Sequence, residues 1–514
     1  MTPVVYRPLD IYLTSSVAWN DAGTQLLVFQ VEMTLPKELK EGHKMLYRKA
    51  DPITKNYDCI IIGSGLAGMT AANKLAKNGR SVLLLEAHNK LGGFATWFKR
   101  SKGNHIFDIS LHGFPFGMKK TCRKYWNKEI ADRIVQIQGV RFSNPMYDIE
   151  TDFTKEDYIN KLIHFFKVPK ENVYGFFDDM ENMNFYDNSK MTNGELFEKY
   201  FPGRKDILRF LLEPIVYANG SNLEDPAITY AIVFSNFMKG GVYTYQGGTD
   251  HMINAMKEEL LKNGVDIKLH SKIDKIIVED KKVIGVELKG QKILSKSVLS
   301  NANIKSTVLN MVGENNFSKE YVEATKNIRL NTSSCQVYMG IKEGETLPRM
   351  KDLIFYSEDE DFSTDLVLSP KVGSQTFSLY YPDMRPELNN RFAIVSSSNA
   401  RYEDWANLSE DEYKEKKEYI IERALSALDE VIPEAREKID FIDAATPLTV
   451  EKYTHHLSGA SFGTKFEGLE ISQNLHKNIE GLFHAGSVGI IMSGWLGAAN
   501  YGVIQSHEIE NFLS

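Results

Sequence analysis

The stretch from residue 57 to residue 86 reads YDCIIIGSGLAGMTAANKLAKNGRSVLLLE. Its first six residues end in three isoleucines and form a short apolar run typical of a buried parallel strand. A glycine-rich turn follows, and then a segment rich in Ala, Leu and Lys predicts a helix over 69–78 that ends at Gly79. A second apolar run over 81–85 predicts another buried strand, closed by Glu86. This order of elements predicts the start of an α/β fold.

The glycines of this turn, Gly63, Gly65 and Gly68, have the spacing of a dinucleotide-binding motif. Gly63 allows a sharp exit from the strand, Gly65 removes a side chain where a pyrophosphate approaches, and Gly68 allows close packing of the helix. The helix N-terminus offers free N–H groups and its positive dipole end to phosphate. Glu86 is placed to accept hydrogen bonds from ribose hydroxyls and would repel a 2′-phosphate. An ordinary glycine-containing turn is the alternative, and the order of the elements disfavours it.

Composition and charge exclude several classes of protein. The chain has 514 residues, which at roughly 100–200 residues per domain predicts two to four structural units. With 42% hydrophobic and 25% charged residues, global disorder is excluded. The 61 basic and 68 acidic residues give a net charge of −7, so the basic excess of a nucleic-acid-binding protein is missing.

The cysteines and histidines give no metal or disulfide signature. Three cysteines lie far apart, which argues against a disulfide scaffold and against a closely spaced zinc site. His455-His456 has no third ligand at a sensible spacing, so we interpret it as a surface pair and expect no metal. The cysteine usage favours the reducing cytosol.

Two segments bear on the N-terminus and on membranes. Residues 1–56 read as an N-terminal extension, in which 11–17 and 25–33 have strand-like composition and predict a small hairpin, with a partly ordered arm as the alternative. The first nineteen residues lack the apolar core of a secretory signal. Residues 481–506 contain no Asp, Glu, Lys or Arg but hold six glycines, which favours a buried, tightly turned segment near a ligand over a membrane span.

The middle of the chain alternates between helical and strand-like segments. Residues 150–240 are mainly helical in pattern and rich in aromatics, and 409–430 predict a charged amphipathic helix. Strands are predicted within 268–288, around a turn at Glu279-Asp280, and at 335–341, 375–381 and 391–397. This interleaving argues against independent domains arranged one after another.

Further glycine segments favour FAD over NAD as the dinucleotide. Leu91-Gly92-Gly93 resembles the second glycine pair of the glutathione-reductase superfamily of flavoproteins, and residues 481–487 (GLFHAGS) resemble that superfamily's second flavin-contacting signature. The resemblance implies a helix whose N-terminus points at the flavin, where its dipole stabilises the reduced ring. The superfamily usually has an acid at the position of Ser487, and a serine can still hydrogen-bond there. The predicted cofactor-binding residues are Gly63, Ser64, Gly65, Leu66, Ala67, Gly68, Glu86, Ala87, Gly92, Gly93, Phe94, Ala95, Ile276, Gly486, Ser487, Gly497 and Ala498.

Other segments resemble enzymes related to phytoene desaturase. Residues 107–113 (FDISLHG) resemble the segment found in retinol saturases, and similar matches occur at 245–249, 272–286, 298–301, 446–449 and 459–463. The resemblance implies a fold like that of amine oxidases and phytoene desaturases. In that fold a discontinuous Rossmann-type FAD-binding domain accompanies a mixed α+β substrate domain. We expect the FAD-binding domain to consist of residues 57–145, 240–310 and 450–514, and the substrate domain of 146–239 and 311–449.

The same resemblance implies a function. We expect an FAD-dependent desaturase, saturase or redox-neutral isomerase that acts on carbon–carbon double bonds of an apolar polyene, isoprenoid or unsaturated lipid. Apolar helices over 207–217 and 228–237 are consistent with a substrate tunnel, and they equally fit ordinary core helices or a membrane-contacting surface. The alternatives are a flavin amine oxidase and a non-catalytic FAD-containing lipid-binding protein. We expect a cytoplasmic protein, or one peripheral on the inner face of a membrane, and the electron donor or acceptor stays open.

His112 is the leading catalytic candidate. Histidine titrates near neutral pH, and this one follows the Phe107-Asp108 pair as in retinol saturases, where it would orient or protonate one end of the substrate. A structural histidine bonded to a backbone carbonyl is the alternative. His484, beside the flavin-loop glycines, is a further candidate, as are three residues of the last glycine-rich segment: Trp495, Asn500 and Tyr501.

Overall fold

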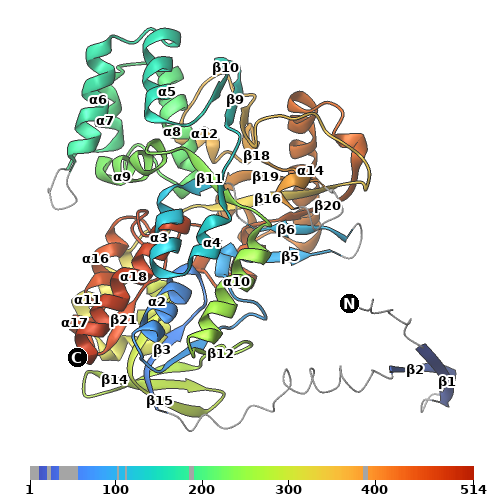
Figure 1. The fold of residues 1–514 in the computed structure, drawn as a ribbon, viewed down its shortest axis with the longest axis vertical. Helices are drawn as coiled ribbons and strands as arrows, with labels where there is room; N and C mark the ends of the chain where they lie inside the picture. The colour runs from blue at the N-terminus through green and yellow to red at the C-terminus, as the bar shows by residue number, and fades with distance from the viewer. Residues whose placement is uncertain are drawn as a thin grey trace, which may run out of the picture. The chain divides into compact units, whose positions relative to one another are not determined.

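The computed structural model describes residues 11–19, 25–33, 56–100, 104–109, 113–183, 190–385 and 392–514. The chain divides into two compact units, Met1–Lys55 and Asn56–Ser514. In the first unit, β1 (Ile11–Trp19) and β2 (Gln25–Met33) pair as an antiparallel hairpin. The second unit contains all the other described elements, arranged around two large sheets (Figure 1).

The first sheet contains the glycine motif. Its strand order is β12-β4-β3-β15-β14-β13, and β21 pairs with the far end of β15. Five of these strands run parallel, whereas β14 and β13 continue from β15 as an antiparallel meander. The strands are β3 (Tyr57–Ile62), β4 (Val82–Leu85), β12 (Asp266–Lys268), β13 (Lys275–Glu279), β14 (Lys282–Leu288), β15 (Gln291–Ser300) and β21 (Leu482–His484).

The parallel part of this sheet is apolar because helices cover it. All four residues of β4 are buried, as are Cys59 to Ile62 in β3. Helix α2 (Leu66–Lys77) packs against α18 (Gly494–Leu513) and α10 (Thr249–Lys262), which brings the start, middle and end of the unit together (Figure 1). Gly502 of α18 sits so close to α2 that a Cβ there would lie 2.2 Å from the Ala67 carbonyl oxygen.

The second sheet has the order β10-β9-β17-β18-β19-β16-β20 and is antiparallel except for the β9–β17 pair. On one face, α14 (Glu410–Val431) packs its Ile420 and Leu428 against an apolar core that includes Val337 and Phe377. Ser409 and the Glu412 side chain form a capping box that begins this helix. The strands are β9 (Val140–Asn144), β10 (Tyr147–Thr151), β16 (Ser333–Ile341), β17 (Leu353–Ser357), β18 (Ser374–Tyr380), β19 (Ala393–Ala400) and β20 (Ile439–Ala445).

A helical cap rich in aromatic residues packs against β9 and β17 of this sheet. Tyr158 stacks on Phe210 with ring centroids 4.3 Å apart, and Phe142 of β9 stacks on Phe355 of β17 at 5.0 Å within the same core. The cap consists of α5 (Lys155–Asn160), η3 (Lys161–Phe165), α6 (Lys170–Asn182), α7 (Asn193–Tyr200), α8 (Lys205–Asn219) and α9 (Ala227–Met238).

Short elements link the two sheets. A three-stranded sheet joins β7 (Phe114–Pro115), β11 (Val242–Tyr245) and β8 (Ile134–Gln136), and β5 (Trp97–Lys99) pairs with β6 (Ile106–Asp108). The remaining described elements are η1 (Gly93–Ala95), α3 (Gly117–Tyr125), α4 (Lys128–Asp132), η4 (Ser306–Gly313), η5 (Glu314–Asn316), α11 (Lys319–Asn327), α12 (Thr364–Val367), η6 (Pro382–Met384), α13 (Glu403–Ala406), η8 (Arg436–Lys438), α15 (Pro447–Thr454), η9 (Leu457–Gly459), α16 (Glu467–Gln473) and α17 (Leu475–Asn478).

The expected α/β class is confirmed, with a parallel sheet of Rossmann type beside a second, mixed α+β part. The domain bounds inferred from the sequence stay a prediction. One of them, at residue 145, falls between β9 and β10, which pair with each other in the second sheet. Among the described helices, none is long and apolar enough to cross a membrane.

Candidate active site

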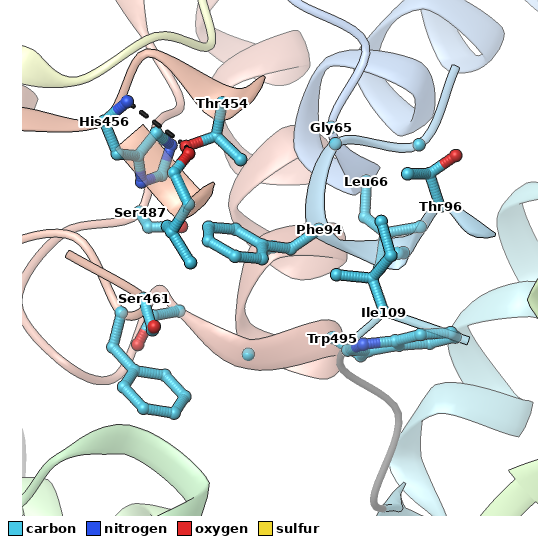
Figure 2. A pocket seen from close by; sticks show the side chains of 18 of the residues that line it. Gly65, Leu66, Phe94, Thr96, Ile109, Thr454, His456, Ser461, Ser487 and Trp495 are labelled. Carbon is cyan, nitrogen blue, oxygen red and sulfur yellow. Dashed lines mark hydrogen bonds between the residues drawn. The ribbon is translucent and has the colours of Figure 1, made fainter. Parts of the chain in front are cut away.

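A cavity of about 1420 Å³ lies between the two sheets. The glycine motif lines one end, and residues of β16–β19, α8 and α9 line the other. In Figure 2, Phe94 reaches from beside the Gly65 turn toward Ser487 and His456, and Trp495 lies below Ile109. Segments from the start, middle and end of the chain therefore share one cavity.

The glycine turn is packed so closely that side chains are excluded from it. A Cβ at Gly68 would lie 2.2 Å from the Gly63 carbonyl oxygen, and a Cβ at Gly65 would lie 2.8 Å from Oδ1 of Asn301. Gly63 has a φ of +91°, a conformation that other residues rarely adopt. Gly63, Ser64, Gly65, Leu66 and Ala67 line the cavity, whereas Gly68 supports the turn from behind.

Asn301, directly after β15, holds this turn to the C-terminal segment. Its Oδ1 accepts a hydrogen bond from the Gly68 N–H at 3.1 Å, and its Nδ2 donates to the Ala485 carbonyl at 2.9 Å. The side chain also lines the cavity. The sequence interpretation did not include Asn301 in the site, although a polar residue that ends a buried apolar strand is a signal for it.

Glu86 lies at the end of β4, as the sequence predicts. One carboxylate oxygen, Oε2, accepts from the Ser64 N–H at 2.8 Å and from the Ser64 hydroxyl at 2.5 Å. The other oxygen, Oε1, accepts from the His88 N–H at 2.8 Å. Each carboxylate oxygen offers two lone pairs, so Oε1 keeps capacity for a further donor such as a ribose hydroxyl. Glu86 and Ala87 both line the cavity.

The second glycine pair touches the first glycine turn. The Gly92 N–H donates to the Ser64 carbonyl at 2.9 Å, and a Cβ on Gly93 would lie 3.0 Å from the Gly65 Cα. Gly92, Gly93, Phe94 and Ala95 all line the cavity. Gly65 and Gly93 leave the backbone of the two loops uncovered where they meet in a glycine cradle, as binding of a pyrophosphate requires.

The C-terminal segment brings a helix N-terminus to the same cavity. Ser487 and the first five residues of α18, which include Gly497 and Ala498, line it. Gly486 does not line the cavity, because its Cα faces the Ala302 carbonyl oxygen, which a Cβ would approach to 2.2 Å. Gly486 thus places this loop rather than contacting the cavity.

Ile273, and not the predicted Ile276, contributes an isoleucine to the cavity wall. Ile276 is buried within β13 and does not line the cavity. Ile273 lines the cavity three residues earlier, in a segment where the Ser271 N–H donates to the Glu86 carbonyl at 2.8 Å. That backbone contact holds the segment before Ile273 against the end of β4, and the apolar pattern alone did not distinguish the two isoleucines.

Neither of the two histidine candidates, His112 and His484, is placed in the cavity by the described residues. His112 lies outside the described residues, so its catalytic role stays a prediction, and its neighbours Ile109 and Gly113 line the cavity. His484 is buried, bonds the Ser472 hydroxyl at 2.6 Å and the Ala302 carbonyl at 2.9 Å, and does not line the cavity. Burial lowers the pKa of His484 to about 4, which favours a neutral, structural histidine.

The interpretation of His455-His456 as a surface pair fits only His455. Both histidines line the cavity, but His455 is exposed and His456 is half-buried. The His456 ring bonds the Ala460 carbonyl at 3.0 Å and stands edge-on to Phe94, with ring centroids 5.4 Å apart. Burial lowers the pKa of His456, so its ring is neutral near pH 7.

The last glycine-rich segment contributes two of its three candidates. Trp495 lines the cavity and stacks on Phe114 with centroids 5.2 Å apart, and Asn500 lines it while its Oδ1 accepts from the Thr121 hydroxyl at 2.9 Å. Tyr501 faces away from the cavity and bonds the Ser472 hydroxyl at 2.5 Å. The cavity wall beside the glycine cradle is therefore aromatic.

Comparison with known proteins identifies the class of this flavoprotein site. The model of the family described as flavin containing amine oxidoreductase matches residues 66–488. The chain belongs to this family, so it is an enzyme that uses a flavin.

Curated relatives are similar along most of the chain. A chloroplastic prolycopene isomerase of Daucus carota is 24% identical over 89% of this chain and 80% of its own. An all-trans-retinol 13,14-reductase of Danio rerio is 24% identical over 83% and 80%. A 1-hydroxycarotenoid 3,4-desaturase of Flavobacterium sp. (strain P99-3) is 25% identical over 83% and 93%.

Solved structures share the fold. An oxidoreductase from Methanosarcina mazei gives a TM-score of 0.62 at 16% identity, covering 88% of this chain and 99% of its own. Wild-type putrescine oxidase bound to putrescine gives 0.58 at 13% identity, covering 89% and 99%. The expected resemblance to flavoproteins related to phytoene desaturase is confirmed.

Proposed function

We propose that this protein is an FAD-dependent oxidoreductase or redox-neutral isomerase that acts on carbon–carbon double bonds of an apolar polyene, isoprenoid or unsaturated lipid. The carrying observation is the single cavity that joins the glycine cradle to an apolar wall. Its volume of about 1420 Å³ exceeds the roughly 300–1,000 Å³ of ordinary small-molecule pockets, which suits a cofactor and a long substrate together.

The residues at the cradle fit FAD. Gly65 and Gly93 leave backbone open to a pyrophosphate, Glu86 has lone pairs for ribose hydroxyls, and the α18 N-terminus offers N–H groups to the electron-rich end of a flavin. Thr96 and Asn303, which both line the cavity, each have one buried side-chain atom (Oγ1 and Nδ2) without a hydrogen-bond partner among the described residues. Such atoms are costly unless a ligand or water satisfies them.

The other end of the cavity fits a hydrocarbon chain. Helices α8 and α9 and strand β17 line it with the apolar residues Pro214, Ile215, Ile232, Val233, Phe237, Leu353 and Phe355. When bound, FAD supplies hydride transfer or stabilises charge on a polyene. The apolar wall keeps water away from that chemistry and orients the chain by burial of its surface.

Among the described acids that line the cavity, none is available to recognise an amine at this end. Glu86 and Asp274 lie beside the nucleotide cradle, and Asp443 bonds Lys417 at 2.8 Å and Arg100 at 3.3 Å. An alkylammonium in an apolar site needs a carboxylate or an aromatic cage. Because no free carboxylate faces this end among the described residues, the distribution of charge favours the polyene over the amine of a flavin amine oxidase.

The test begins with the purified protein reconstituted with FAD, which is checked by its visible absorbance and by release of the cofactor on denaturation. The holoenzyme is then incubated with a C40 polyene, a C20 polyene and a series of alkylamines, each with an oxidising quinone and with dithionite-reduced flavin. We expect a new polyene or a changed double-bond geometry by liquid chromatography. Amine-dependent flavin reduction without any polyene product would overturn the proposal in favour of an amine oxidase, and FAD binding without any turnover would favour a binding protein.

A further inference from the structure

A strongly basic helix lies beside an opening of the cavity. Residues 117–132, which include α3 and α4, contain five basic and two acidic residues, whereas the whole chain has a net charge of −7. The local excess of positive charge therefore has the opposite sign to the charge of the chain. A surface of this kind attracts an anionic partner.

Helix α3 has one buried face and one charged face. Met118 and Cys122, four residues apart, are fully buried. Lys120 and Lys124, also four residues apart, are exposed. Side chains four residues apart lie on the same face of a helix, so the two lysines point together toward solvent.

Four lysines on this side of the molecule are available to a partner. They are Lys120 and Lys124 of α3, Lys128 of α4, and Lys239 directly after α9, and all four are exposed. Among the described residues, no acid forms an ion pair with any of them, whereas nearby Asp132 pairs with an arginine at 2.6 Å. We call these four lysines the basic rim.

The basic rim borders the cavity because α3 runs alongside α18 (Figure 1). A Cβ on Gly117 would lie 2.7 Å from the Leu496 side chain, and the Thr121 hydroxyl donates to Asn500 at 2.9 Å. Leu496 and Asn500 both line the cavity. Each helix advances by four residues between these two contacts, so the two helices run side by side in the same direction.

Ile504 marks the opening of the cavity at the surface. It lies one helical turn beyond Asn500, lines the cavity and is 41% exposed. One turn beyond the Thr121 contact, α3 reaches Lys124, which is therefore level with Ile504. An exposed apolar side chain and an exposed cation thus lie next to each other at this opening.

The end of α9 joins the same region. Ile232 and Val233 of α9 line the cavity and are half-buried, and Lys239 follows the helix directly. The next residue, Gly240, would place a Cβ 3.3 Å from Phe116, the residue before α3. The lysines of α3 and of the α9 end therefore belong to one surface.

An opening that combines an apolar wall with a cationic rim fits the surface of a bilayer that contains anionic lipid. A long hydrocarbon avoids contact with water when it passes directly between two apolar environments. Lysines close to such a bilayer are attracted by its headgroups. An acidic protein would use the lysines but would give the exposed Ile504 no role. We propose that the basic rim docks this protein on an anionic bilayer, with the opening at Ile504 facing the lipid.

This proposal rests on the proposed function only for the apolar nature of the substrate, and docking is measured without turnover. The FAD-loaded full chain is sedimented with vesicles of phosphatidylcholine alone and with vesicles that also contain phosphatidylglycerol. We expect binding to the anionic vesicles to be at least about tenfold tighter. High salt should reduce this binding, because it screens charges at a surface.

The decisive variant combines Lys120→Gln with Lys124→Gln. Each lysine close to an anionic bilayer contributes about fivefold to binding, so the loss of two should weaken binding by about 25-fold. The matched control combines Lys289→Gln with Lys292→Gln, which removes the same charge at the turn between β14 and β15, away from the cavity lining. The control should bind within about threefold of the unmodified protein. The unfolding temperature of each variant shows that it is folded.

The outcomes separate docking from chemistry. Equal binding to both kinds of vesicle, or binding to neither, overturns the docking and leaves the proposed function intact, because polyene turnover is measured in detergent micelles. A Lys120/Lys124 variant that binds like the unmodified protein, or a control that loses as much binding, also overturns it. Retention on immobilised poly-L-glutamate without vesicle binding would overturn it in favour of an acidic protein partner. Vesicle binding without any polyene turnover in micelles would overturn the proposed function alone.

Discussion

The close approach of Gly68 to Gly63 predicts that one added methyl group will weaken cofactor binding. In Gly68→Ala, the new Cβ would lie 2.2 Å from the Gly63 carbonyl oxygen, far inside ordinary van der Waals contact, and 2.9 Å from Oδ1 of Asn301. The first neighbour is backbone and cannot rotate away. Relief therefore requires a shift of the glycine turn that lines one end of the cavity.

The expected size follows from the cost of overpacking. Extra methyl groups in a tightly packed site cost about 1–3 kcal/mol. If the shift is expressed in the cofactor-binding turn, the Kd for FAD rises by about 5- to 150-fold, since 1.4 kcal/mol corresponds to about tenfold. The assay is titration of the apoprotein with FAD, followed by quenching of flavin fluorescence, together with the unfolding temperature of the apoprotein.

Gly194→Ala is the matched control. Gly194 also lies in the first turn of a helix, α7, but a Cβ there would be 3.4 Å from its nearest neighbour, the Leu223 carbonyl oxygen. We expect unchanged FAD affinity and an equal or higher unfolding temperature, because alanine is favoured over glycine in helices by up to about 1 kcal/mol. The reasoning is refuted if Gly68→Ala binds FAD within twofold of the unmodified protein, whatever its unfolding temperature.

Two further predictions concern buried charge. Burial, opposed by the nearby Arg209 charge and the Ser374 hydrogen bond, raises the pKa of Glu213 to about 7. The unfolded state releases this proton near pH 4.5 and the folded state near pH 7, so the contribution of Glu213 to stability is fully present below pH 4.5 and is lost as the pH rises through 7. Glu213→Gln should therefore remove about 2.5 kcal/mol of the fall in unfolding free energy between pH 5 and pH 8 in urea titrations, and an unchanged fall would contradict this. The Arg385 side chain is 4% exposed and forms ion pairs with Asp108 and, at 2.7 Å, with Asp250. Arg385→Ala should therefore lower the free energy of unfolding by about 3–5 kcal/mol in the same assay, because it leaves two buried carboxylates unpaired. A loss below about 1 kcal/mol would show that these ion pairs are not buried as described.

Short patterns of apolar and polar residues predicted the position of several helices and strands. The strands over 57–62 and 81–85 correspond to β3 and β4, and the helix over 409–430 corresponds to α14. The helix after the glycines begins at Leu66, three residues before the predicted start at 69, because the glycine motif itself forms the first turn of α2. A helical start within a glycine run gives no propensity signal, since glycine disfavours helix.

Site residues were predictable where one motif supplies both the geometry and the chemistry, as at Gly65, Gly93 and Glu86. They were missed where distant segments meet. Asn301 reaches Gly68 across 233 positions of sequence, and the segment that contains Ile273 is held to Glu86 by a backbone bond from Ser271. His484 is the opposite case. It is adjacent in sequence to the loop that contains Ser487, but side chains alternate along its strand, and the His484 side chain bonds the Ser472 hydroxyl instead of lining the cavity.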